Sequence, residues 1–264
     1  MSTARIFDSH AHYDDQAFEN DRDTLLSSLP DRGVCGVLNC ASNVSSARVS
    51  LQLAERYPFL YAAVGVHPSE LPDAQPQDLE TLRQLYTHPK AVAIGEIGLD
   101  YHYDTTPRET QRDWLRAQLT LAVELDAPVI LHDRESHEDM LSLLRAFRPK
   151  GVVHCFSGSV EMMREVVNLG LYIGLGGATT FKNARRPLEV AAAVPIDRLL
   201  LETDAPYMAP VPYRGQRCES WMIARTAEQI AAVRGCGVDE LLRQTEQNVY
   251  ALFSKMRPDS GQVK

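Results

Sequence analysis

AVAIGEIG, residues 91–98, is an apolar run that contains one carboxylate, and it has the character of a buried parallel strand. Its apolar residues are continuous rather than alternating, as in strands that are covered on both faces. Similar short runs are spread along the whole chain, at residues 4–10, 36–41, 61–67, 128–133, 151–156, 171–177 and 198–204. The sequence therefore predicts eight buried strands.

The segments between these runs show the spacing of apolar residues that is typical of helices. The clearest helix is predicted at 107–125, with Thr106 as its N-cap, Pro107 at its first position and Glu109 completing a capping box. Other helices are expected after Asn43, before His88, and at residues 136–147, 159–169, 184–194, 219–234 and 238–254. Strands that alternate with helices in this way predict an α/β fold of the (β/α)8 type, the TIM barrel.

Length and composition limit the class of protein further. The 264 residues suffice for a single barrel domain, residues 1–264, with a loose tail from about residue 257. The sequence contains neither a leader-like apolar segment nor a run of roughly 18 apolar residues, so we expect a cytoplasmic protein without a membrane contact. We also expect a monomer. Its five cysteines form no C-x-x-C pair, which argues against a disulfide framework. A net charge of −8 excludes a generally basic nucleic-acid coat but allows a local basic rim.

Several of the apolar runs end in a side chain that can bind a divalent metal. In a (β/α)8 barrel the carboxyl ends of the strands form the active-site face, so we expect these side chains to meet there. A carboxylate within an apolar strand is costly to bury unless it is paired or metal-bound. Any one of the histidines alone could equally be packed or bonded to backbone, but their agreement in position favours a metal site. The six candidates are His10, His12, Glu96, His132, His154 and Asp204.

The number of candidate ligands favours a binuclear centre. A single catalytic zinc uses three protein ligands and keeps one position open for water. We therefore predict two divalent ions, Mg²⁺, Mn²⁺ or Zn²⁺, with Glu96 and Asp204 as catalytic residues. Two ions about 3.5–4 Å apart would hold a water between them and lower its pKa, and Asp204 would accept the proton of that water. His10, His12 and Asp204 are assigned to one ion and His132 and His154 to the other, with Glu96 bridging.

Motifs along nearly the whole chain resemble those of the TatD-type metal-dependent deoxyribonucleases, a branch of the amidohydrolase superfamily. They are FDSHAHYD (7–14), GVHP (65–68), GEIGLDYH (95–102), PVILHDR (128–134), HCFSG (154–158), ETDAPYMAPVPYRG (202–215) and QNVYALF (247–253). The resemblance implies a TIM-barrel-like fold, one or two divalent ions and 3′-to-5′ exonuclease action on DNA. The family's metal ligands fall on the same six residues. Ser69 and residues 216–220 depart from the family's usual pattern, which bears on substrate preference.

Further side chains near the same strand ends are candidates for substrate binding. His67 ends the third run and could bond a phosphate oxygen, while Arg134 and Arg214 could offer their guanidinium groups to phosphate. Each of them could instead have a purely structural or solvated role. Three tyrosines on the predicted loops could stack on the bases of a single strand, or serve only in packing. They are Tyr101, Tyr103 and Tyr207.

The first hypothesis for function is a metal-dependent 3′-to-5′ exodeoxyribonuclease that acts on the ends of single-stranded DNA. The alternative is a metal-dependent ester or amide hydrolase, for example one that acts on aminoacyl esters of RNA, because binuclear sites polarise carbonyl and phosphoryl groups alike. A barrel that only binds a partner would need a damaged metal site, and all six candidate ligands are present.

Overall fold

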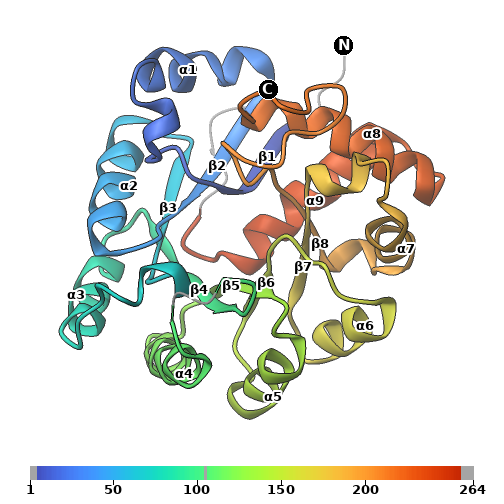
Figure 1. Cartoon of the computed structure of the whole chain (residues 1–264). Coiled ribbons are helices and arrows are strands. Elements are labelled where there is room, and N and C mark those ends of the chain that lie inside the picture. The colour runs from blue at the N-terminus through green and yellow to red at the C-terminus, as the bar shows by residue number, and fades with distance from the viewer. Residues whose placement is uncertain (1–4, 104–105, 257–264) are drawn as a thin grey trace.

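The computed structural model describes residues 5–103 and 106–256, and its strands form one parallel sheet in which each strand pairs with the next along the chain (Figure 1). The strands are β1 (Ile6–Ala11), β2 (Val34–Cys40), β3 (Leu60–Val64), β4 (Ala91–Asp100), β5 (Val129–Arg134), β6 (Gly151–Val153), β7 (Tyr172–Leu175) and β8 (Leu199–Leu201). Ala11 and Ala205, just past β8, form a parallel bridge that nearly closes the sheet into a barrel. The predicted TIM-barrel class is confirmed.

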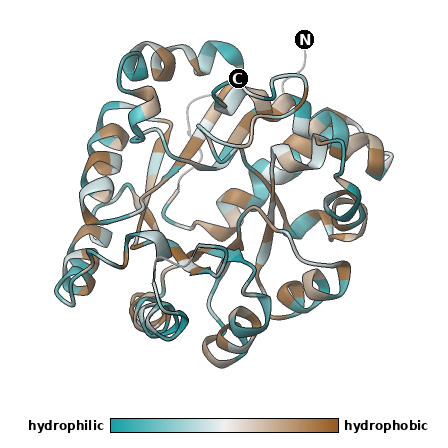
Figure 2. Cartoon of the chain, viewed as in Figure 1, coloured by the Kyte–Doolittle hydropathy of each residue, from teal (hydrophilic) through white to brown (hydrophobic). Residues whose placement is uncertain are grey.

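Most of the helices surround the barrel on its outer side, and the last one lies across the middle of the view (Figure 1). They are α1 (Arg22–Ser28), α2 (Val44–Arg56), α3 (Asp78–Tyr86), α4 (Arg108–Glu124), α5 (His137–Phe147), α6 (Val160–Asn168), α7 (Arg185–Ala193), α8 (Ile223–Arg234) and α9 (Val238–Leu252). Figure 2 shows hydrophobic and hydrophilic residues alternating along α2, as expected for a helix with one face on the sheet. The short α1 was missed by the sequence reading. None of the described helices is both long and apolar enough to span a bilayer.

The start of α4 differs from the prediction. Pro107 is the N-cap of this helix, with no side-chain capping bond, and Arg108 is the first helical residue. Pro107 has an extended backbone, with φ −53° and ψ 138°, so it is not the first helical residue and Thr106 is not the N-cap, and the predicted capping box is wrong. Asn43 does cap α2, since its side chain accepts the backbone N–H of Ser46 at 2.9 Å. The predicted loose tail from residue 257 lies outside the described residues.

The strands carry two apolar layers, one on each face. The outer layer joins strand residues such as Ile94 and Leu131 to the surrounding helices, including Leu115 of α4. The inner layer fills the barrel with residues such as Ala93 and Ile130, and Phe253 after α9 belongs to it. Because this inner layer is apolar, the polar groups of the strands gather at their carboxyl ends, where a site can form.

Candidate metal centre

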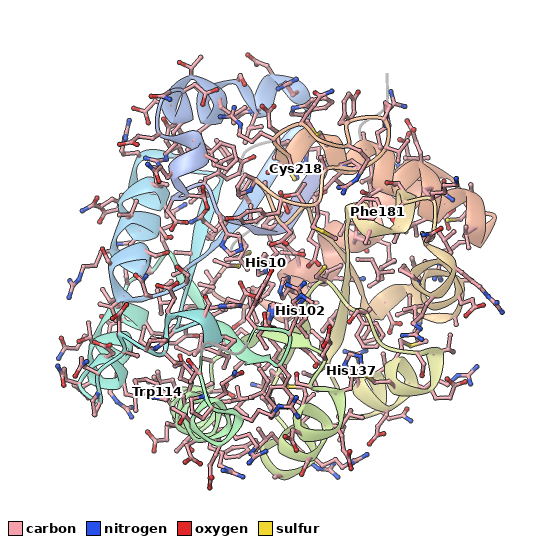
Figure 3. The ribbon with its side chains drawn as sticks, in the orientation of Figure 1. His10, His102, Trp114, His137, Phe181 and Cys218 are labelled. Carbon is pink, nitrogen blue, oxygen red and sulfur yellow. The ribbon has the colours of Figure 1, made fainter. Side chains whose placement is uncertain are left out.

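The six predicted ligands lie together at the carboxyl ends of the strands. Five of them lie within three residues of the end of a strand, and Glu96 lies in the second half of β4, four residues before its end. Figure 3 shows His10 near the middle of the ring of helices, whereas Trp114 lies out on α4. Their ligand atoms, together with those of His67, form overlapping groups, in each of which all the atoms lie within 4.8 Å of one another: His10, His12 and Glu96; His10, His154 and Asp204; His67, Glu96 and His132.

A register shift in β4 directs Glu96 into the site. Ile94 pairs with Val129 and Ile97 with Leu131, so β4 advances three residues while β5 advances two. Ile94 and Ile97 both belong to the outer apolar layer. Regular alternation would place Glu96 on the same outer face as Ile94, but the bulge turns it inward. A similar shift between Asp8 and Ala11 in β1 includes His10.

Glu96 lies between two sets of imidazoles. Its Oε2 is 3.3 Å from His10 Nε2 and 3.6 Å from His12 Nε2, while its Oε1 is 2.9 Å from His132 Nδ1 and 2.8 Å from His154 Nε2. Only 3 % of this residue is exposed. Burial alone would raise the pKa of Glu96, but the surrounding imidazoles, His154 above all, hold the pKa well below its usual value. The carboxylate is therefore ionised and faces both sets.

Asp204 completes the first set. Its Oδ1 lies 3.3 Å from His12 Nε2 and 3.6 Å from His10 Nε2, and those two nitrogens are 3.0 Å apart. In the described part of the chain the ion pairs of Glu96 and Asp204 are all with histidines. Such a convergence of nitrogen lone pairs and carboxylate oxygens fits a divalent cation of the zinc or manganese type.

Hydrogen bonds outside the cluster fix the ring orientation of two ligands. His12 Nδ1 lies 2.7 Å from the Cys40 carbonyl, which can only accept, so this nitrogen donates, and Nε2 offers a lone pair whenever the ring is neutral, as it is when it binds a metal. His132 Nε2 donates to Asp100 Oδ2 at 3.2 Å, which leaves Nδ1 facing Glu96. In both rings the inward nitrogen is the one that can ligate, an orientation typical of metal-binding histidines.

The surroundings of the site raise the pKa values of two of its histidines and lower that of a third. Burial disfavours protonation of His12, but its hydrogen bond to Asp204 and the charge of Glu96 raise its pKa to about 10. Burial likewise opposes protonation of His132, yet Asp100 and Glu96 raise its pKa to about 9. For His10, burial and the neighbouring His154 lower the pKa to about 4. The carboxylates thus attract positive charge, and a bound cation would meet the same field.

Two buried carboxylates near the ligands were missed by the sequence reading. Asp100 ends β4, which runs two residues further than predicted, and it orients His132. Glu202 is fully buried and lies 3.9 Å from His154 Nδ1, and burial raises its pKa to about 8. Glu202 precedes Asp204 by two residues, and residues at this spacing on a strand point to the same face. This spacing could have indicated that Glu202 lies near the site.

Sharp turns after β6 and β8 position the last two candidate ligands, His154 and Asp204. Cys155, next to His154, has φ 43°, and Asp204 has φ 67°. The left-handed region is strained for residues other than glycine, so other contacts must hold it. Cys155 donates its backbone N–H to the Glu202 carboxylate, and Asp204 donates its own to the His10 carbonyl at 2.9 Å. Glu202 therefore helps to fix the turn that directs His154.

Replacing Asp100 with alanine is expected to weaken metal binding by about 10–100-fold, because His132 loses the acceptor that holds its ring. Competition with a chromogenic chelator, titrated with Zn²⁺ and Mn²⁺, measures this affinity. Asp139→Ala is the matched control, since Asp139 also accepts side-chain hydrogen bonds, from Tyr101 and Arg112, but on α5. Equal affinities of the Asp100 and Asp139 variants would contradict the role of Asp100.

The three predicted substrate residues differ in their surroundings. His67 follows β3, and its Nε2 lies 3.6 Å from Glu96 Oε1. Arg134 ends β5 on the same face as His132; among the described residues it forms no ion pair, and its guanidinium carbon lies 4.9 Å from the centre of the Tyr103 ring. Arg214 donates to the Ala209 carbonyl at 3.1 Å and lies 3.9 Å from the centre of the Phe181 ring, so part of it is engaged in its own loop.

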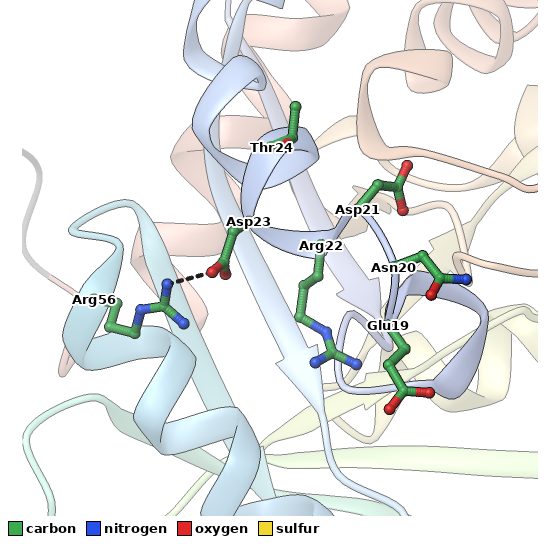
Figure 4. A pocket seen from close by; sticks show the side chains of 7 residues that line it. All are labelled: Glu19, Asn20, Asp21, Arg22, Asp23, Thr24 and Arg56. Carbon is green, nitrogen blue, oxygen red and sulfur yellow. Dashed lines mark hydrogen bonds and ion pairs between the residues drawn. The ribbon is translucent and has the colours of Figure 1, made fainter.

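A cavity of about 220 Å³ lies beside α1 and α2, lined by residues 19–24 and Arg56 (Figure 4). Arg56 pairs with Asp23 at 2.7 Å, and Arg22 donates to the carbonyls of Tyr13 and Asp15. No histidine lines it, and these charged groups already have partners. The histidine cluster, rather than this cavity, is the candidate site.

Comparisons with known proteins agree with the fold and with a metal-dependent hydrolase. The family model of the TatD-related DNases matches residues 7–254. YabD of Bacillus subtilis, named an uncharacterized metal-dependent hydrolase, is 37% identical over 94% of this chain and 98% of its own. The 3′-5′ ssDNA/RNA exonuclease TatD of Erwinia tasmaniensis is 35% identical over 94% of this chain and 100% of its own. The crystal structure of the TatD homologue YjjV from Escherichia coli K12 superposes with a TM-score of 0.90 at 37% identity, covering 95% of this chain and 98% of that one. The chain therefore belongs to the TatD-related DNase family and is a metal-dependent hydrolase of ester bonds.

Proposed function

We propose that this hydrolase is a 3′-to-5′ exodeoxyribonuclease that acts on the ends of single-stranded DNA. The observation that carries the proposal is the position of Glu96, whose two oxygens face two separate sets of imidazole nitrogens. An arrangement of this kind suits phosphodiester hydrolysis, which benefits from charge stabilisation on both the attacking and the leaving oxygen. The exonuclease name of the Erwinia relative supports the same substrate class.

The donor set supports two divalent ions, Mg²⁺, Mn²⁺ or Zn²⁺. His10, His12 and Asp204 would hold one ion and His132 and His154 the other, with Glu96 between them. When bound, such ions lower the pKa of a coordinated water and neutralise charge on phosphoryl oxygens.

Asp204 is the residue that would take the proton of the attacking water. Its side chain is 20% exposed, whereas that of Glu96 is 4% exposed, so Asp204 is the more accessible of the two carboxylates. Burial would raise the pKa of Asp204, but the hydrogen bond from His12 and the nearby imidazoles hold it below its usual value. The side chain is therefore ionised and able to accept a proton.

Arg134 and the exposed tyrosines would hold the strand. Arg134 forms no ion pair among the described residues, so its guanidinium group could bind a phosphate, and Tyr103, over whose ring it lies, is more than half exposed. Tyr207 is also more than half exposed, and its ring centre lies 6.5 Å from that of His12. Aromatic rings beside a cationic group are the usual means of binding single strands without sequence preference. With a net charge of −8, we expect this binding to be weak and salt-sensitive.

Removal of metal with a chelator should abolish cleavage, and resupply of Mg²⁺, Mn²⁺ or Zn²⁺ should restore it. The test uses single-stranded oligonucleotides labelled at one end. A 3′-to-5′ enzyme releases the 3′ label at once as a mononucleotide, while a 5′-labelled strand shortens step by step. Glu96→Ala is the inactive control, and His88→Ala, at a histidine paired with Glu55, is the active one. Absence of cleavage with any ion, in protein shown to hold metal, would contradict the proposal and favour carboxylic esters such as aminoacyl esters of RNA.

A further inference from the structure

His67 faces the metal cluster, but the hydrogen bond at its outer nitrogen runs in the direction opposite to those of His12 and His132. The backbone N–H of Ser69 donates to His67 Nδ1 at 3.1 Å, and the Ser69 hydroxyl lies 2.8 Å from the same nitrogen. A backbone N–H can only donate, so Nδ1 must carry a lone pair. The proton of the imidazole is therefore on Nε2, the nitrogen that faces Glu96.

This tautomer separates His67 from the histidines beside it. His12 and His132 donate from their outer nitrogens to oxygen atoms and turn a lone pair inward. His67 accepts at its outer nitrogen and turns an N–H inward. Its ring is edge-on to that of His132, with centres 4.5 Å apart, so the position is close to the ligands while the inward atom cannot ligate.

The inward N–H has no acceptor among the described residues. Its nearest charged neighbour is Glu96 Oε1 at 3.6 Å, beyond hydrogen-bond distance, and the His67 side chain is 15% exposed. A donor at the edge of an ionised centre, open to solvent and without a partner in the protein, is available to a ligand.

The backbone on either side of His67 is firmly held. His67 donates its own N–H to the Ser42 carbonyl at 2.8 Å. Gln118 of α4 binds the preceding residue at both groups, accepting from Val66 N–H at 2.8 Å and donating to the Val66 carbonyl at 3.0 Å. The donor is thus fixed before substrate arrives, which is the condition under which a hydrogen bond contributes most to a transition state.

We propose that His67 is a hydrogen-bond donor to the substrate rather than a metal ligand, and that its Nε2–H binds a non-bridging oxygen of the scissile phosphate. Negative charge on that oxygen would be stabilised by a donor that is already in place. The identity of the bound oxygen rests on the proposed nuclease function, whereas the exclusion of His67 from the metal ligands does not.

The test compares His67→Leu, which removes the donor, with His67→Gln, which keeps an N–H group, and with His88→Ala as the control. Metal per chain is measured in the loaded proteins, and kcat and KM are measured on bis(p-nitrophenyl) phosphate and on a single-stranded oligonucleotide. We expect unchanged metal content in every variant. For His67→Leu, kcat should fall by roughly 100–1,000-fold with little change in KM, and His67→Gln should recover part of it.

Two results would overturn the proposal: loss of metal from His67→Leu, which would make His67 a ligand, or full kcat in that variant. Failure of the nuclease function has a different signature, because the wild-type protein would then cleave neither phosphodiester. In that case p-nitrophenyl acetate replaces them, and the same comparison of kcat decides whether His67 donates to the reacting oxygen of a carboxylic ester.

Discussion

Replacing Glu96 with glutamine is expected to empty the metal centre and to lower the hydrolytic rate by about four orders of magnitude. Glutamine has nearly the shape of glutamate but carries no charge. The substitution therefore removes the one carboxylate that faces both His10 and His12 on one side and His132 and His154 on the other. Metal content after gel filtration and the rate of oligonucleotide shortening measure the two effects.

Glu135→Gln is the matched control, because Glu135 is also paired with a histidine, His102 at 2.8 Å, but in an exposed position. We expect this variant to keep both metal and rate. Full metal occupancy in Glu96→Gln would show that the histidines and Asp204 suffice, and that Glu96 does not bridge.

The barrel and the meeting of the candidate ligands could be predicted because both depend on short-range patterns. Apolar runs such as residues 91–98 and 128–133 mark strands, and parallel strands necessarily bring their carboxyl ends together. A histidine or carboxylate at the end of such a run is therefore near every other one. His67 was found in this way, although its direction of hydrogen bonding was not, since that depends on one backbone N–H at Ser69.

What the sequence could not supply is register. Alternation from Ile94 would have turned Glu96 outward, and only the pairing of β4 with β5 reveals the bulge that turns it inward. Gly98 shows how close this pairing is, because a Cβ there would overlap the carbonyl oxygen of His132. The same strand extends to Asp100, so the carboxylate that holds His132 lay beyond the predicted end.

Polar contacts between residues far apart in the sequence could not be predicted either, and Asp8 makes the most important of them. The residue lies in β1 and is completely buried. Its carboxylate accepts from Thr203 twice, from the backbone N–H at 3.0 Å and the hydroxyl at 2.6 Å, and from the Ser220 hydroxyl at 2.6 Å. Thr203 follows β8 and Ser220 begins a short 3-10 helix, Ser220–Met222. One side chain thus connects the first strand to segments near the other end of the chain.

These contacts lie where the first strand, β1, meets the last strand, β8. Among the described residues, no ladder joins β1 to β8, whereas every other neighbouring pair forms one. The two are connected by the bridge of Ala11 with Ala205, by the backbone bonds beside it, and by the Ser9 hydroxyl, which donates to the Leu201 carbonyl at 3.0 Å. Asp8 supplies hydrogen bonds where the sheet lacks them. It also accepts from the backbone N–H of His10 at 3.3 Å, so the junction of β1 with β8 and the first candidate ligand are held by the same carboxylate.

Asp8→Ala is therefore expected to lower the free energy of unfolding by about 3–5 kcal/mol, because buried donors lose their acceptor and must remain unpaired. Urea unfolding followed by tryptophan fluorescence and by circular dichroism measures the change. Asp23→Ala, which removes a solvent-exposed carboxylate paired with Arg56, should leave the midpoint unchanged. Equal midpoints for the two variants would mean that the backbone bonds beside Ala205 close the barrel without help. A large decrease in the free energy of unfolding for Asp8→Ala alone would mean that a buried carboxylate joins β1 to the segments after β8, where no ladder of backbone hydrogen bonds does so. The stability of the barrel and the position of His10 would then depend on the same group.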